Sequence, residues 1–171
     1  GNVYFRAEVS AGSAPRGLFV DQAGTDSAVA LQGDSAPGTS GTFFQFPDLN
    51  GFSVNDSGVI GHSAGILGGG AQNQGIFKSS LAAGSEDVAL VGQTAPDAGV
   101  ATFLTLGDGA SINASGQTAF RSNLLGGSVA RGIFLLPEPA RAPACHAALA
   151  ALALLRRRRG VLEGRAADPR R

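Results

Sequence analysis

The chain has 171 residues with 13 basic and 13 acidic side chains, so its formal net charge is zero. The charge is unevenly divided, because residues 1–155 carry a balance of −5 and residues 156–171 a balance of +5. An acidic main body with one tyrosine and no tryptophan excludes a nucleic-acid-binding domain, and a single cysteine, Cys145, excludes an internal disulfide.

Short alternating segments in the first fifty residues predict β-strands. Val3, Phe5, Ala7 and Val9 alternate with the polar or amphipathic residues between them, so we expect them on one face of a half-buried strand. Residues 17–21, 28–31 and 42–46 supply three more strands. No apolar period of 3.6 residues is sustained before residue 143, and the 26 glycines indicate many turns. The sequence therefore predicts an all-β fold.

Short patterns recur along the chain at a spacing of 57 to 60 residues. The clearest matches are Gly1, Gly58 and Gly116; Gly17-Leu-Phe19, Gly75-Ile-Phe77 and Gly132-Ile-Phe134; Val29-Ala-Leu31 and Val88-Ala-Leu90; and Phe43 and Phe103. Such matches in order indicate about two and a third tandem copies over residues 1–136, with boundaries near 57 and 115.

Each copy is expected to form a four-stranded antiparallel unit that resembles a propeller blade, with a β-solenoid or a stack of small sheets as the alternative. About two copies are too few to close a ring of about 4–8 blades. We therefore interpret the chain as the C-terminal part of a longer array. The recurring phenylalanines Phe5, Phe19, Phe77, Phe120 and Phe134 are predicted to be buried at equivalent places. Before each first strand, the motif Asn and Gly are predicted to form a turn with left-handed backbone geometry at the Gly.

Residues 113–120, with Asn113, Gly116, Ala119 and Phe120 at the defining positions, resemble the NxxGxxAF motif of bacterial choice-of-anchor tandem-repeat proteins. Asn55 and Gly58 match the same motif, although Gly61 and His62 stand where that family has Ala and Phe. The resemblance covers about residues 1–136. It implies an exported, surface-held repeat array and no catalytic residues.

The C-terminal region has the layout of a sorting signal. Pro137, Glu138 and Pro139 are followed by an Ala/Leu-rich segment and then by Arg156, Arg157, Arg158 and Arg159. This order resembles the PEP-CTERM signal, and a cysteine such as Cys145 ahead of the apolar stretch is closer to the related MYXO-CTERM signal. The resemblance implies envelope sorting machinery as a partner, and the arginines would stay on the cytoplasmic side of the membrane.

The uncharged stretch 142–155 is only about 21 Å long as a helix, against a hydrocarbon core of about 30 Å. A short C-terminal helix or a disordered tail therefore remains the alternative for residues 137–159. Residues 160–171 are expected to be a disordered tail.

Candidate chemical groups are few. His62 takes the place of Phe5 and Phe120, which favours a core residue over a ligand or base. Asp34 becomes Gln93 in the next copy, so the acids do not recur as a calcium-binding set would, and turn formation is the better interpretation. We expect no catalytic residue, metal or cofactor.

Two function classes stay open. The first is an exported, envelope-associated scaffold or binding platform without enzymatic activity. The second is the C-terminal part of a propeller-type hydrolase or lyase whose active residues lie upstream.

Overall fold

β-strands are the only regular elements in the part of the chain that the computed structural model describes, which is residues 1–10, 12, 14–46 and 51–136. The strands are β1 (Val3–Glu8), β2 (Arg16–Gln22), β3 (Thr25–Leu31), β4 (Thr42–Gln45), β5 (Phe52–Val54), β6 (Ile60–Leu67), β7 (Gln74–Ser80), β8 (Gly84–Leu90), β9 (Thr102–Ile112), β10 (Thr118–Leu125) and β11 (Arg131–Leu136). The predicted all-β class is confirmed. The predicted C-terminal helix and tail lie outside the described residues.

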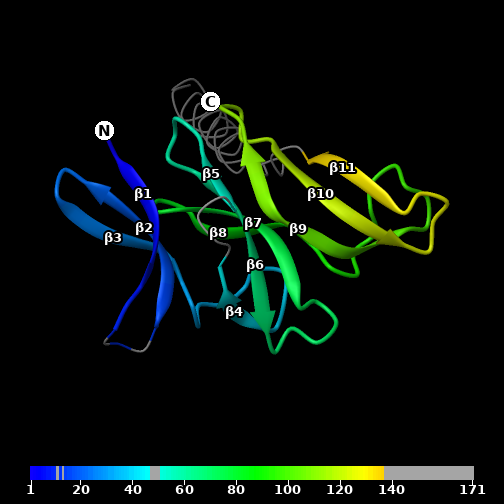
Figure 1. Ribbon diagram of the computed structural model, residues 1–171, viewed down its shortest axis with the longest axis horizontal. Helices are drawn as coiled ribbons and strands as arrows, with labels where there is room; N and C mark the ends of the chain where they lie inside the picture. Colours follow the sequence, from blue (N-terminus) through cyan, green and yellow to red (C-terminus); the bar gives the residue numbers. More distant parts are fainter. Residues whose placement is uncertain (11, 13, 47–50, 137–171) are drawn as a thin grey trace, which may run out of the picture. The chain divides into compact units, whose positions relative to one another are not determined.

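The strands form three antiparallel sheets (Figure 1). The first sheet has the order β1-β2-β3, and the third has the order β11-β10-β9. The second sheet has the order β4-β6-β7-β8, with β5 also paired with β6. The expected four-stranded units are therefore wrong in detail, because the sheets have three, five and three strands.

A tight turn explains why the sheets do not begin where the sequence copies begin. Ile112, the last residue of β9, pairs with Thr118, the first residue of β10. A connection this short makes the two strands pair as an antiparallel hairpin. Val54 and Ile60 pair across the preceding turn in the same way. The last strand of one copy consequently joins the sheet of the next copy.

Two hydrophobic clusters form the core. The first contains Leu18 and Ala30 of the first sheet together with Ile60 and Phe77 of the second. The second contains Ile76 and Ala89 of the second sheet and, from the third, a larger group: Phe103, Leu106, Ala110, Phe120 and Leu124. The second sheet is thus covered on both faces, with one cluster on each.

The recurring glycines and aromatic residues occupy matching register positions. Phe5 lies opposite Phe19, His62 opposite Phe77, and Phe120 opposite Phe134. In each Gly-x-Phe segment the phenylalanine ring lies over the glycine two residues earlier. A Cβ atom on Gly17, Gly75 or Gly132 would be 2.5–3.1 Å from the ring of Phe19, Phe77 or Phe134. Glycine recurs here because the ring occupies the space of a side chain.

Replacing Gly75 with alanine is expected to destabilise the fold by about 1–3 kcal/mol through overpacking. The new methyl group would lie 2.5 Å from the Phe77 ring and 2.8 Å from Leu90 Cδ2, and both of these side chains are fully buried. Urea unfolding monitored at a constant m-value measures the loss. Gly65→Ala in β6 is the control, because its nearest contact would be an ordinary 3.4 Å to Gln45. Equal stability of the two variants would contradict this explanation of the recurring glycine.

Two predictions about faces are corrected. Tyr4, expected on the outer face of β1, packs against the first core cluster, so the first strand presents a different face to the core than its alternation indicated. Phe77 and Phe120 are buried as predicted, but Phe5, Phe19 and Phe134 are only half-buried. In a series of sheets both faces of a strand can be covered, so alternation alone does not tell which face meets the neighbouring sheet.

Candidate functional site

The motif residues Asn55 and Asn113 each organise a tight turn. The Asn55 Oδ1 atom accepts hydrogen bonds from the Ser57 and Val59 backbone amides, both at 3.0 Å. The Asn113 Oδ1 atom accepts one from the Gln117 amide at 2.9 Å, and Asn113 Nδ2 donates to Gln117 Oε1 at 2.8 Å. The predicted left-handed geometry is confirmed, since φ is +76° at Gly58 and +78° at Gly116.

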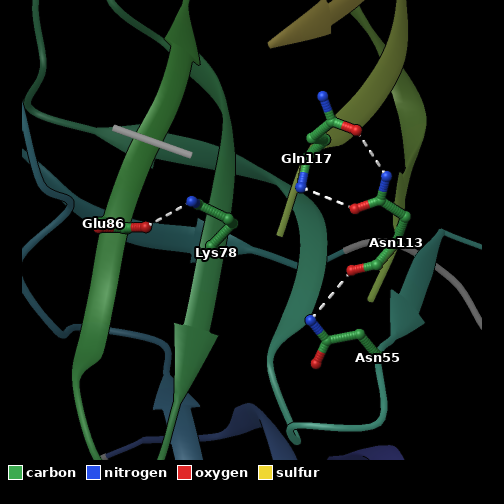
Figure 2. A network of polar contacts seen from close by, with 5 residues as sticks. All are labelled: Asn55, Lys78, Glu86, Asn113 and Gln117. Atoms are coloured by element: carbon green, nitrogen blue, oxygen red, sulfur yellow. Dashed lines mark hydrogen bonds and ion pairs between the residues drawn. The ribbon is translucent and has the colours of Figure 1, made fainter. Parts of the chain in front are cut away.

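The two motif turns also bind to each other. Asn55 Nδ2 donates to the Asn113 carbonyl oxygen at 3.1 Å, although the residues are 58 positions apart (Figure 2). Close by, the Ser53 hydroxyl donates to the Ala110 carbonyl at 3.0 Å and accepts from the Ile112 amide at 2.7 Å. The two Ser53 bonds join β5 to β9, and the Asn55 bond joins the turns that follow these two strands.

Two more side chains of the second sheet bind the backbone of β9 at its middle. Ser63 Oγ donates to the Asp108 carbonyl at 3.1 Å, and Gln74 Oε1 accepts from the Leu106 amide at 3.0 Å. We call Ser53, Asn55, Ser63 and Gln74 the sheet joint. A strand edge that faces a neighbouring sheet needs such partners, because a buried backbone polar group without one is costly.

Asp34 and Gln93 have the same structural role. The Leu31 amide donates to Asp34 Oδ2 at 2.8 Å, and the Leu90 amide donates to Gln93 Oε1 at 2.9 Å. A neutral amide thus replaces a carboxylate without loss of the contact. The predicted turn role of Asp34 is confirmed. This position requires a hydrogen-bond acceptor and does not require a negative charge.

His62 is a core residue, as predicted, but it is also hydrogen bonded. It is fully buried beside the rings of Phe43, Phe46 and Phe77. Its Nδ1 atom lies 3.2 Å from the Ser63 carbonyl, which can only accept, so Nδ1 carries the proton and Nε2 accepts from Ser79 Oγ at 2.8 Å. Burial lowers the pKa of His62 from 6.5 to about 4, while the Ser63 contact acts to raise it. The ring is neutral at pH 7.

A serine bonded to a histidine can act as an activated nucleophile. Here Ser79 is only 1% exposed and its oxygen lies 2.7 Å from Ser85 Oγ. No substrate atom can reach a side chain so deeply enclosed. We therefore interpret the hydrogen bonds among Ser85, Ser79 and His62 as partners for buried polar groups and not as a catalytic arrangement.

Lys78 is a buried cation in β7, with only 3% of its side chain exposed. Its Nζ atom lies 2.7 Å from Glu86 Oε1, and the Glu86 side chain is 51% exposed (Figure 2). The ion pair lacks hydrogen-bond geometry, so Lys78 Nζ has no hydrogen-bond acceptor in the described residues. Lys78 follows Ile76 by two residues and so shares its face of the sheet, towards the second core cluster.

Substituting Glu86 and substituting Lys78 are expected to change the stability of the fold in different directions. Glu86→Gln should cost about 1–2 kcal/mol, because it leaves a buried ammonium without its counter-charge; half-exposure of Glu86 keeps the cost low. Lys78→Met should be neutral or stabilising, since an apolar side chain of similar length suits the buried position better. Thermal and urea unfolding of both variants and of the double variant measure these effects. A Lys78→Met variant less stable than Glu86→Gln would show that the lysine itself holds the sheets together.

A cleft of about 530 Å³ lies beside the Asn55 turn. Asn2, Tyr4 and Gln22 of the N-terminal region line one part of it, and residues 55–58 and 80–82 line the rest. Gly58 is required here twice over, because its φ is positive and a Cβ atom would lie 2.6 Å from the Tyr4 hydroxyl. The lining of amides, hydroxyls, one carboxylate and one aromatic ring can offer hydrogen bonds and a stacking surface to a polar ligand.

A smaller cleft of about 290 Å³ is lined by Gln45, Phe46, Ser63, Ala64, Gly65, Asn73, Gln74 and Asp108. Two of these residues, Ser63 and Gln74, already belong to the sheet joint. The first cleft is therefore the better candidate for a binding site.

Of the predicted motif residues, Asn55, Gly58, Asn113 and Gly116 come together in the two linked turns. Ala119 and Phe120 continue into β10, where Phe120 is buried and Ala119 is half-buried opposite Leu135. The predicted sorting residues Pro137, Glu138, Pro139 and Arg156 to Arg159 lie outside the described residues.

Sequence reasoning missed Ser53, Tyr4 and Lys78. Ser53 has a counterpart in Ser111, 58 residues later, and this recurrence was a usable signal. Lys78 is the only lysine in the chain, and it lies between Phe77 and two serines. That neighbourhood is unusual for a solvated cation.

Among residues 1–46 and 51–136, as far as they are described, no group of three or more His, Cys, Asp or Glu side chains is placed to hold a metal ion. No helix within the described part of the chain is long and apolar enough to cross a membrane. The described residues can form hydrogen bonds between the sheets, and those around the first cleft can make polar contacts with a ligand.

Comparison with known proteins identifies one family. Residues 1–134 match the model of a family of unknown function, DUF7453. Neither the curated proteins nor the solved structures include a match to this chain.

Proposed function

The chain belongs to this family, and we propose that it is an exported, envelope-associated β-repeat protein that acts as a non-enzymatic scaffold or binding platform. In this proposal each sheet is a blade-like unit of a tandem array. The cleft beside Asn55 and Tyr4 is its ligand-binding surface.

One observation carries the scaffold proposal. Ser53 and Asn55, two polar residues with counterparts in the next copy, use their side chains to join the second sheet to the third, as Asn55 does when it donates to Asn113. Ser53 donates and accepts across the same junction. The side chains of catalytic residues would instead point into a cleft, with donors or acceptors left free for a substrate. The Ser79 and His62 pair is enclosed in the core and supports the same interpretation.

The envelope part of the proposal depends on the C-terminal sequence. Pro137 to Pro139 is followed by an Ala/Leu-rich stretch and by four arginines, and the charge balance changes from −5 to +5 at residue 156. Positively charged residues after an apolar segment favour retention on the cytoplasmic side of a membrane. We propose that residues 137–159 act as a removable sorting and tethering signal.

A reporter fusion tests this proposal directly. Residues 130–171 are fused to an exported reporter in a host that has the matching sorting machinery. We expect envelope retention or C-terminal trimming of the reporter. Both should be lost when Arg156 to Arg159 are changed to serine, and kept when they are changed to lysine, which preserves the charge.

Release of the reporter intact and untrimmed with the native tail would contradict the sorting proposal. The function would then reduce to that of a β-repeat domain with a polar cleft. A hydrolase or lyase activity of the longer protein that is abolished by closing this cleft, for example with Ser57→Trp at an exposed lining position, would instead favour the enzymatic alternative.

A further inference from the structure

The second and third sheets contain the same three-ring cluster. In the third sheet Phe103 meets Phe134 edge-on at 5.0 Å and 90°, and Phe120 stacks on Phe134 at 5.8 Å and 26°. In the second sheet Phe43 meets Phe77 at 4.9 Å and 88°, and His62 stacks on Phe77 at 5.8 Å and 28°. The edge-on ring comes in the second sheet from β4, which is separated from the motif turn by β5, and in the third sheet from β9, which runs directly into the motif turn.

The first sheet contains only two of the three rings. Phe5 stacks on Phe19 at 5.7 Å and 20°, which matches the stacked pairs of the other sheets. No described residue takes the place of Phe43 or Phe103 beside them. Phe5 and Phe19 are accordingly half-buried, whereas Phe43, Phe77 and Phe103 are at most 2% exposed.

In the second and third sheets the rings lie on the face towards the preceding sheet. Phe77 of the second sheet packs with Leu18 of the first, and Phe120 of the third packs with Ile76 of the second. In the first sheet Tyr4 and Leu18 face the second sheet. Their neighbours Phe5 and Phe19 therefore point to the opposite face, because successive side chains of a strand alternate.

The edge of the first sheet is incomplete in the corresponding place. β6 pairs on one side with β7 and on the other with β4 and β5, and β10 pairs with both β11 and β9. The equivalent strand β1 pairs only with β2 among the described strands. An edge strand of this kind presents backbone donors and acceptors that can take a further strand.

A side-chain position on this edge shows where the missing ring belongs. Phe43 lies opposite Ile66, and Phe103 lies opposite Leu124. The residue at the same distance from the motif ring Phe5 is Val9, which directly follows β1 and is 38% exposed. A phenylalanine opposite Val9 would cover both it and the Phe5 and Phe19 pair.

We propose that the outer edge of β1, with the Phe5 and Phe19 face, is a docking surface for a further repeat unit of the same kind. The last strand of that unit pairs antiparallel with β1 and supplies the third ring. The inference goes beyond the proposed function and does not depend on the C-terminal tail. A second copy of this chain is disfavoured as the occupant, because its β9 is already paired with β10 and its Phe103 is buried in its own cluster.

The test extends the full chain at its N-terminus with a copy of residues 99–115. The added segment ends in the sequence Asn-Ala-Ser and runs directly into Gly1, which recreates the Asn-x-x-Gly spacing with Phe5 four residues after the glycine. Hydrogen exchange then measures the alternate β1 amides that point away from β2. We expect their exchange to slow about tenfold or more relative to the unextended chain.

Two matched extensions serve as controls. The same segment with its phenylalanine changed to alanine (Phe103→Ala in the added copy) should protect β1 much less, and a scrambled segment should not protect it. Protection of β10 reports whether each protein is folded. Unchanged exchange of the β1 amides in a folded, extended chain would overturn the proposal, as would equal protection by the alanine or scrambled segment. Light scattering of the unextended chain should show a monomer, and a dimer with protected β1 amides would make the occupant a second copy instead.

Discussion

Phe120→Ala is expected to lower the free energy of unfolding by about 3–5 kcal/mol, the range for truncating a buried aromatic side chain. Phe120 is 3% exposed and lies between the rings of Phe103, at 5.7 Å, and Phe134, at 5.8 Å. Its removal leaves a cavity between the second and third sheets, because both neighbours belong to or pack on the second core cluster. Urea unfolding followed by far-ultraviolet circular dichroism measures the change.

Phe44→Ala is the matched control for this variant. Phe44 is 50% exposed in β4, so its truncation should cost less than about 1 kcal/mol. A loss below about 1 kcal/mol for Phe120→Ala in a cooperatively unfolding chain would mean that the ring cluster does not hold the third sheet in place.

Acidification from pH 7 to pH 4 is expected to remove about 3 kcal/mol of stability through His62 alone, at 1.36 kcal/mol per pKa unit. The pKa of His62 is about 4 in the folded chain and 6.5 without burial, and desolvation is the main cause. Between these values the unfolded chain binds a proton that the folded chain does not. The contribution is therefore complete above pH 6.5 and is lost as the pH falls towards 4.

His62→Phe isolates this effect. The substitution places at position 62 the residue that stands at Phe120 in the third sheet, and Ser79 keeps Ser85 as a hydrogen-bond partner. The two proteins differ in titratable groups only at position 62, so the difference between the two stability curves reports His62. The wild-type curve should fall more steeply between pH 6.5 and 4. Parallel curves would contradict a neutral, buried His62.

The local features of the fold could be predicted from the sequence, but their partners could not. Gly58 and Gly116 were expected in left-handed turns because of the Asn-x-x-Gly pattern, and both have positive φ. The same pattern does not reveal that β4 and β5 pair with β6, because strand propensity carries no information on which strand is the neighbour. The pairing of β5 with β6 follows once the turn is recognised as a hairpin connection, but the pairing of β4 with β6 does not.

The candidate site shows the same limit. Asn55 was predicted to form a turn, and it does so through Ser57 and Val59. Its contact with Asn113 could not be predicted, since two residues 58 positions apart meet only through the packing of complete sheets. The burial of Lys78 depends likewise on the third sheet, which covers a face that β7 alone leaves open.

Native-state hydrogen exchange of Ser53→Ala tests most directly whether the recurring polar residues join the sheets into one scaffold. The substitution removes the hydroxyl that bonds both Ala110 and Ile112, and Ser57→Ala at an exposed turn position is the control. We predict that amides of β6 and β10 lose protection by the same factor, because the joined sheets open together. Loss confined to the Ile112 amide, with β6 and β10 unchanged, would contradict the account.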